Sequence, residues 1–111
     1  MNVVENDNAI RGMLIDELKR CQEMVGDLEK AASALPRGVL NLRKKRYKEK
    51  EYLYYYLKYR EGRKVISKHI PKDEVDRIKN GLELRKRYER EIKSFIKRIG
   101  YLNKLLGSSE E

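Results

Sequence analysis

The stretch EYLYYYLKYREGRKVISKHI, residues 51–70, decides the fold of this chain. From Tyr52 to Tyr59, Tyr and Lys occupy the even positions while Leu and Tyr occupy the odd ones. A period of two is typical of a β-strand, and tyrosine is a good strand former. A second alternating run extends from Arg63 to Ile70. Because glycine takes a positive φ at little cost, we expect Glu61-Gly62 to be the two-residue loop of a β-hairpin.

A third strand is expected on the N-terminal side of this hairpin, joined to it by a four-residue loop, Lys48 to Glu51. The three runs predict an antiparallel β-meander with strands over residues 39–47, 52–59 and 63–70. The loop lengths also predict a register, because a hairpin loop fixes which residues face each other. The predicted pairs are Tyr47 with Tyr52 and Leu42 with Leu57 in the first hairpin, and Arg60 with Arg63, Leu57 with Ile66 and Leu53 with Ile70 in the second.

Long helical patterns lie on both sides of the meander, over residues 6–35 and 73–106. Their apolar side chains recur three and four residues apart, which is the spacing of a helix that packs along its length. Cys21 lies within the first stripe and is expected to be a core residue, while Gly81 weakens the second helix by about 1 kcal/mol relative to alanine. The stripes consist of Ile10, Leu14, Leu18, Cys21, Val25, Leu28, Ala32 and Leu35, and of Val75, Ile78, Leu82, Tyr88, Ile92, Phe95, Ile99, Leu102 and Leu106.

These elements predict a single α+β domain over residues 1–111: a long helix, a basic three-stranded antiparallel sheet over residues 38–70, and a second long helix. The two helices are expected to pack antiparallel in a coiled-coil-like manner. Each stripe could also pack against a second copy of the chain, so a homodimer formed through the helices remains an alternative. Further apolar residues beside the stripes widen the apolar arcs, which favours a sheet or a second protomer over them.

The positive charge of the chain is concentrated in the meander. Residues 36–70 contain 12 Lys and Arg against three acids, an excess that equals the formal net charge of the whole protein, +9. The segments before and after it carry small charges of opposite sign that cancel. A local basic field of this size is expected to face one partner, and a polyanion is the natural choice.

Side-chain alternation divides the meander into two faces. One is apolar and suited to packing on a helix; it contains Leu40, Leu42, Leu53, Tyr55, Leu57, Tyr59, Ile66 and Ile70, with Lys44, Arg46, Lys64 and Lys68 at its margins. The other carries tyrosine rings among cations, which suits phosphates, base edges and stacked bases. The residues predicted to bind nucleic acid on this second face are Arg43, Lys45, Tyr54, Tyr56, Lys58, Arg60 and Arg63. We expect DNA rather than RNA as the partner.

Three alternatives stay open at this stage. The cationic face is also compatible with a merely solvated surface, because tyrosine favours strands and lysine protects sheet edges from pairing. The rings also suit burial under a helix or a second subunit. Finally, the whole chain also fits a protein-interaction or structural module that dimerises through its helices while the sheet docks on an acidic protein.

Several classes of function are disfavoured by the sequence. The single cysteine and single histidine, Cys21 and His69, are too few for an internal disulfide or a zinc site. No phosphate-cradling glycine loop, carboxylate pair or activated nucleophile is identified, so we expect a protein that is not an enzyme and uses no cofactor or metal. The N-terminus MNVVENDN has no signal-peptide pattern and no stretch approaches a membrane span, so a cytoplasmic location without a membrane partner is expected.

Two stretches of the chain resemble known families. The motif Leu35-Pro36-Arg37-Gly38 and the run YLYYYLKYREGRKVISKHIPKDE, residues 52–74, resemble an uncharacterised prokaryotic domain-of-unknown-function family with an LP-basic-Gly start, a tyrosine-rich strand and an Arg-Glu-Gly turn. This resemblance implies no activity. More loosely, a basic three-stranded sheet followed by a helix is similar to the arm-type DNA-binding domains of integrases. That similarity implies contacts to DNA from the sheet, and the absence of a catalytic domain argues against recombinase chemistry.

Overall fold

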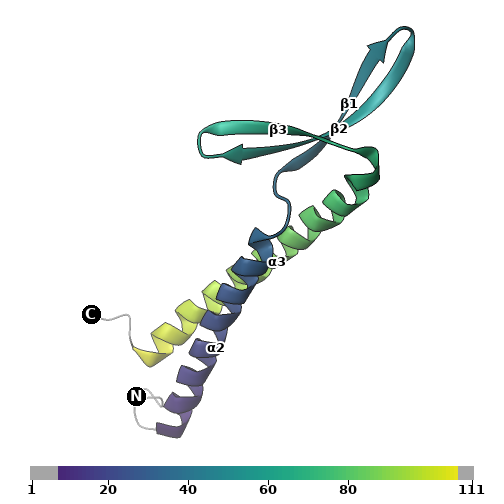
Figure 1. The fold of residues 1–111 in the computed structure, drawn as a ribbon. Helices are drawn as coiled ribbons and strands as arrows, with labels where there is room; N and C mark the ends of the chain where they lie inside the picture. The colour runs from purple at the N-terminus through teal and green to yellow at the C-terminus, as the bar shows by residue number, and fades with distance from the viewer. Residues whose placement is uncertain (1–7, 108–111) are drawn as a thin grey trace. The chain divides into compact units, whose positions relative to one another are not determined.

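The computed structural model describes residues 8–107 and confirms the α+β fold (Figure 1). The chain forms α2 (Asn8–Ser33), β1 (Val39–Tyr47), β2 (Lys50–Glu61), β3 (Lys64–Ile70), a short 3₁₀ helix η1 (Lys72–Glu74) and α3 (Val75–Leu106). The predicted start of the first helix at residues 6 and 7 lies outside the described residues. Two compact units are present: the helical unit, made of α2 with α3 from Arg87 onward, and the sheet unit, Ala34–Lys86.

The strands form a three-stranded antiparallel sheet in the order β1-β2-β3, as predicted. The predicted first loop of four residues is wrong, because β2 begins earlier and Tyr47 pairs with Lys50. The chain turns in two residues, Lys48 and Glu49, with φ values of 49° and 66°. Left-handed φ at both central residues is the requirement of a type I′ turn, whose twist matches that of the strands. Neither position holds a Gly or Asn, so no residue type in the sequence indicates this tight turn.

The second turn also differs from its predicted position. Glu61 pairs with Lys64, so the loop is Gly62-Arg63 and not Glu61-Gly62. Gly62 has the predicted positive φ, at 61°, but as the first residue of the loop. Both predicted registers are therefore wrong by two residues. In the first hairpin, for example, Leu42 pairs with Tyr55 and not with Leu57. A shift of two leaves every strand side chain on its predicted face, since the side-chain period is two.

The core of the sheet unit lies on the face predicted to be apolar. Leu57 and Ile70 of the sheet are buried against Val75 and Ile78 at the start of α3. The half-buried side chains packed around this group are Leu40, Tyr55, Tyr59 and Leu82. The apolar face of the sheet is therefore covered by the first turns of α3, which leaves the opposite face to solvent.

The linker Leu35–Gly38 is fixed by the rest of the sheet unit. The Nη1 of Arg85 donates a hydrogen bond of 2.9 Å to the carbonyl of Leu35, and the Arg37 guanidinium lies 5.5 Å from the centre of the Tyr59 ring. Pro36 packs directly on Gly81, where an added Cβ would lie 2.7 Å from the proline Cδ. The glycine that weakens the helix is thus required by the close approach of the linker.

The helical unit is an antiparallel pair, as predicted. The Nη1 of Arg11, near the start of α2, lies 3.4 Å from the carbonyl of Leu106 at the end of α3, and the two helices pack against each other. The buried side chains of this unit are Cys21, Leu28, Ala32 and Leu102. Cys21 is fully buried and its thiol lies 3.7 Å from a Glu17 carboxylate oxygen, which confirms the prediction that it is a core residue.

Glu17 links the two helices through charge-assisted hydrogen bonds. Its carboxylate accepts bonds from Arg20 at 2.8 and 2.9 Å and from Arg98 of α3 at 2.7 Å. The hydrogen bonds and positive charge of Arg20, followed by those of Arg98, lower the pKa of Glu17 from its ordinary value of 4.5 to about 2. A carboxylate with a lowered pKa stabilises the fold above its unfolded pKa, and this contribution is lost as the pH falls.

We therefore expect Glu17→Gln to be less stable than the wild type near neutral pH, with the difference shrinking as pH falls from 4.5 toward 2. Urea unfolding followed by circular dichroism at several pH values measures this. The matched control Glu29→Gln removes the same charge from an exposed position on α2 and should shift stability much less. A constant difference between wild type and Glu17→Gln down to pH 2 would contradict the interpretation.

Candidate nucleic-acid interface

The open face of the sheet is formed by odd-numbered residues of β1 and β3 and even-numbered residues of β2. We call it the tyrosine face. It consists of Val39, Asn41, Arg43, Lys45 and Tyr47 of β1, Lys50, Tyr52, Tyr54, Tyr56, Lys58 and Arg60 of β2, and Val65, Ser67 and His69 of β3. All its cations are exposed, Tyr52 is 41% exposed, and Tyr54 and Tyr56 are half-buried. Within the sheet unit, the rings are therefore not buried under a helix.

The rings at the centre of this face contact one another. The centroids of Tyr52 and Tyr54 are 6.4 Å apart, and His69 meets Tyr54 and Tyr56 edge-on at 5.8 and 5.7 Å. The Arg43 guanidinium lies 5.2 Å from the centre of the Tyr56 ring. These edge and cation–π contacts explain why the rings are only half-exposed although no helix of the sheet unit covers them. The result is an aromatic cluster with a cation already held against it.

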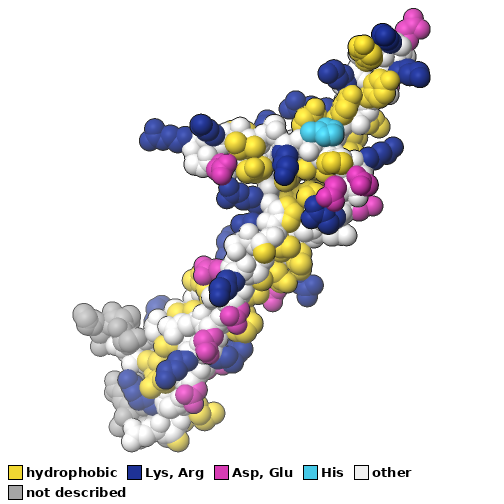
Figure 2. Space-filling view, viewed as in Figure 1, with side chains coloured by type: hydrophobic (Ala, Val, Ile, Leu, Met, Phe, Trp, Pro, Cys, Tyr) yellow, Lys and Arg dark blue, Asp and Glu magenta, His cyan; other side chains and the backbone are white. Residues whose placement is uncertain are grey.

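The structure brings six of the seven predicted site residues onto this face. Tyr54 and Tyr56 belong to the aromatic cluster, and Arg43 and Lys45 lie beside it on β1. Lys58 and Arg60 continue along β2 away from it. Arg63 is different, because it lies in the turn between β2 and β3 and not in the strand predicted for it. Figure 2 shows Lys and Arg side chains along the sheet, with the histidine among hydrophobic ones.

The first hairpin extends beyond the third strand. β3 pairs with β2 only from Tyr55 to Glu61, so residues 50–54 of β2 pair with residues 43–47 of β1 alone. We call residues 43–54 the ribbon; its tip is the turn at Lys48 and Glu49. In Figure 1, β1 and β2 continue past β3 as a two-stranded hairpin.

Two predicted core residues are exposed near this extension. Leu53, within the ribbon, is 59% exposed, and Leu42, next to it, is 50% exposed. The prediction that both side chains are covered is wrong. The prediction that both lie on the same face of the sheet as Leu57 is correct. The core is built from Leu57 and Ile70, beside which β3 still pairs with β2, and the ribbon extends beyond it. Lys44 and Arg46 on the same side of the ribbon are exposed as well.

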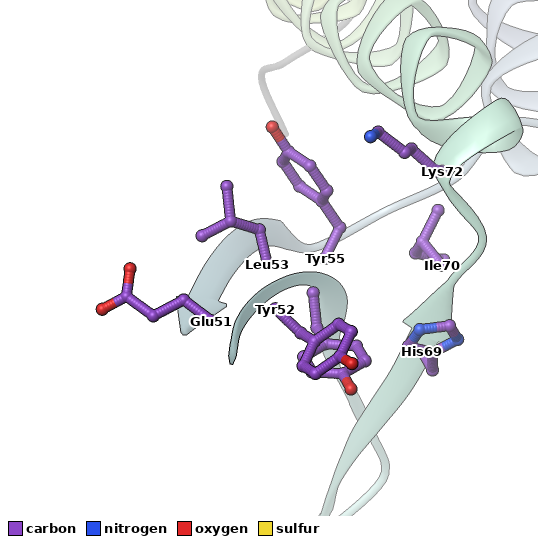
Figure 3. Close-up of a pocket in the computed structure, with 8 residues that line it drawn as sticks. Glu51, Tyr52, Leu53, Tyr55, His69, Ile70 and Lys72 are labelled. Atoms are coloured by element: carbon purple, nitrogen blue, oxygen red, sulfur yellow. The ribbon is translucent and has the colours of Figure 1, made fainter. Parts of the chain in front are cut away.

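A notch of about 580 Å³ lies where β3 stops pairing with β2 (Figure 3). In the figure, Leu53 and Tyr55 extend to one side of β2, and Tyr52 and His69 lie on the other. Its lining residues are Glu51, Tyr52, Leu53, Tyr54, Tyr55, His69, Ile70 and Lys72. The walls are mainly aromatic and aliphatic, with the Lys72 cation on one side. Aromatic and aliphatic walls of this kind suit contact with a flat ring.

Some features of the face were missed or understated from the sequence. The odd position of His69 in the third strand places it on the same face as Tyr54 and Tyr56, and the structure agrees. Side-chain alternation does not indicate that His69, although exposed, also meets both tyrosine rings edge-on. Asn41, between Val39 and Arg43, was not assigned to the face at all. Among residues 8–107, no three His, Cys, Asp or Glu side chains gather where they could hold a metal ion.

Fold and surface together define a small α+β protein with a helical pair and a three-stranded sheet whose open face is cationic and aromatic. The chain belongs to the family described as Domain of unknown function (DUF6788), which matches residues 14–80. The match runs from α2 through the sheet into α3 and includes the Leu35–Gly38 linker. Comparison with curated proteins and with solved structures finds no match. No helix in the described part of the chain has the length and apolar character needed to cross a membrane.

Proposed function

We propose that this protein binds nucleic acid, DNA in preference to RNA, through the tyrosine face and without catalysing a reaction. The observation that supports this most is the exposure of Arg43, Lys45, Lys58 and Arg60 beside an uncovered group of rings on one face of the sheet. The segment that carries these residues also holds an excess of positive charge equal to that of the whole chain. We further propose that the protein acts in the cytoplasm, without a metal or cofactor.

The chemistry of the face fits a nucleic acid better than an acidic protein. Lys and Arg neutralise phosphates and release counterions, which gives affinity that falls with salt. Tyrosine rings offer flat surfaces to bases and sugars, and their hydroxyl groups can reach phosphate oxygens. Arg43 combines both properties, since its guanidinium is planar and already lies against the Tyr56 ring.

The test is fluorescence anisotropy with duplex and single-stranded oligonucleotides at two salt concentrations. The variant Lys45→Gln/Lys58→Gln removes two cations from the tyrosine face, and the control Lys64→Gln/Lys68→Gln removes two exposed lysines from the opposite face. We expect the first variant to bind about tenfold or more weakly and to reduce the slope of log K against log salt by about 1.8, or 0.9 per lost phosphate contact.

The control is expected to bind nearly as the wild type does, because its lysines lie on the face that packs on α3. Equal losses in the two double variants would show that only overall charge matters. Absence of binding by the wild type at low salt would overturn the proposal.

The rival function is a protein-interaction module that dimerises through its helices. The observation in its favour is that Met13, Ile96 and Tyr101 on the helical unit are 71%, 53% and 62% exposed, which leaves apolar surface that a second copy of the chain could cover. Sedimentation of the wild type and of Ile96→Glu distinguishes the two. A concentration-dependent dimer that Ile96→Glu dissociates, together with no nucleic-acid binding, would favour the rival.

A further inference from the structure

We propose that the ribbon, residues 43–54, enters the major groove of B-form DNA with one cationic face toward each phosphate backbone. This inference rests on the proposed function and deepens it, because it names the duplex as the ligand and adds Lys44 and Arg46 to the contact surface. Neither residue lies on the tyrosine face, and neither belongs to the set predicted from the sequence.

The first observation is that both faces of the ribbon are open. β3 does not pair with residues 50–54 of β2, and the core formed by Leu57, Ile70, Val75 and Ile78 contains no residue of the ribbon. Leu53 on one face and Tyr52 on the other are 59% and 41% exposed. A ligand can therefore reach the ribbon from both sides.

The second observation is that each face carries cations. Arg43 and Lys45 lie on the tyrosine face, and Lys44 and Arg46 lie on the opposite face, all four of them exposed. A single strand stacked on the tyrosine face would leave Lys44 and Arg46 without phosphates. A duplex groove has a phosphate backbone along each wall, so it satisfies both pairs at once.

The third observation is one of size. Sheets pack about 10 Å apart, which sets the thickness of a ribbon with its side chains, and the major groove of B-form DNA is about 12 Å wide and about 8.5 Å deep. Five residues per strand span about 17 Å, so the ribbon is long enough to reach the floor of the groove. The major groove of A-form RNA is too narrow for side chains to enter, which makes DNA the matching duplex.

The tip of the ribbon fits the same geometry. The turn places Lys48 and Glu49 at positive φ, where Gly and Asn are sterically favoured. Lys48 holds its ammonium 5.4 Å from the centre of the Tyr47 ring, and Tyr47 is on the tyrosine face. A long cationic side chain therefore occupies the leading end of the ribbon, together with a ring that is 58% exposed.

The experiment uses the full chain, a B-form DNA duplex, the single strand of the same sequence and an A-form RNA duplex. The variant Lys44→Gln/Arg46→Gln is compared with the control Lys64→Gln/Lys68→Gln, which removes the same charge from the same side of the sheet outside the ribbon. We expect the first to weaken duplex DNA binding about tenfold or more and the control to change it less than about twofold.

Methylation by dimethyl sulfate reports which groove is occupied. Guanine N7 faces the major groove and adenine N3 faces the minor groove, so bound protein is expected to protect guanine N7 and leave adenine N3 reactive. Circular dichroism of both double variants verifies that the sheet is intact.

Three results would overturn the inference while leaving the proposed function in place. They are duplex binding that Lys44→Gln/Arg46→Gln does not weaken, bound duplex with reactive guanine N7, and equal affinity for the DNA duplex and its single strand. Failure of the wild type to bind any nucleic acid at low salt would overturn both, so the two failures are distinguishable.

Discussion

Replacing Gly38 with alanine is expected to destabilise the sheet unit by roughly 3 kcal/mol or more. Gly38 has a φ of 108°, a conformation that L residues rarely adopt. An added Cβ there would also collide with the carbonyl oxygen of Lys58 and lie 2.8 Å from the Cβ of Tyr59. The collision is with the backbone of the central strand, which cannot move without disturbing the pairs between β1 and β2.

Chemical unfolding followed in the near-ultraviolet measures this effect, because six of the eight tyrosines lie in the sheet. The matched control is Gly100→Ala, since Gly100 lies within α3 and its added Cβ would meet no atom within 4 Å. Alanine there should stabilise the helix by about 0.5–1 kcal/mol. If Gly38→Ala unfolded at the same denaturant concentration as the wild type, the interpretation that the linker approaches β2 closely would be wrong.

Replacing Arg43 with alanine is expected to cause the largest loss of DNA affinity from any single side chain, roughly 10- to 100-fold. Arg43 pairs directly with Tyr54 across the first hairpin, and its guanidinium lies against the Tyr56 ring. A cation held in this way loses less rotamer freedom on binding than a free lysine does. The substitution removes the proposed phosphate contact and also the cation–π contact of Arg43 with the Tyr56 ring.

The comparison with Arg43→Lys separates charge from shape. Lysine keeps the positive charge but lacks the planar fork, so we expect it to retain the salt dependence of the wild type while binding several-fold more weakly. Anisotropy titrations of the wild type and both variants at two salt concentrations measure this. An Arg43→Ala variant with wild-type affinity would place the contact surface elsewhere on the molecule.

The composition of the tyrosine face could be predicted from the sequence because it depends only on parity. Arg43, Tyr54 and Tyr56 share a face whether the first hairpin loop has two residues or four. The predicted and observed registers differ by two residues, and an even shift leaves every side chain on the same face. The positions of the turns were harder to predict from the sequence. Nothing in Lys48-Glu49 indicates a left-handed pair, because the residues that usually reveal such a turn are Gly, Asn and Asp.

What the sequence by itself determined was the order of the elements, the two faces of the sheet and the concentration of charge in the meander, because each follows from local periodicity or composition. Only the tertiary structure decided where the core ends. It buries Leu57 and Ile70 under the first turns of α3 and leaves Leu42 and Leu53 exposed at the ribbon. The physical reason is that burial depends on which residues far apart in the chain come together, and that depends on strand lengths and close contacts such as Pro36 on Gly81, which no periodicity encodes.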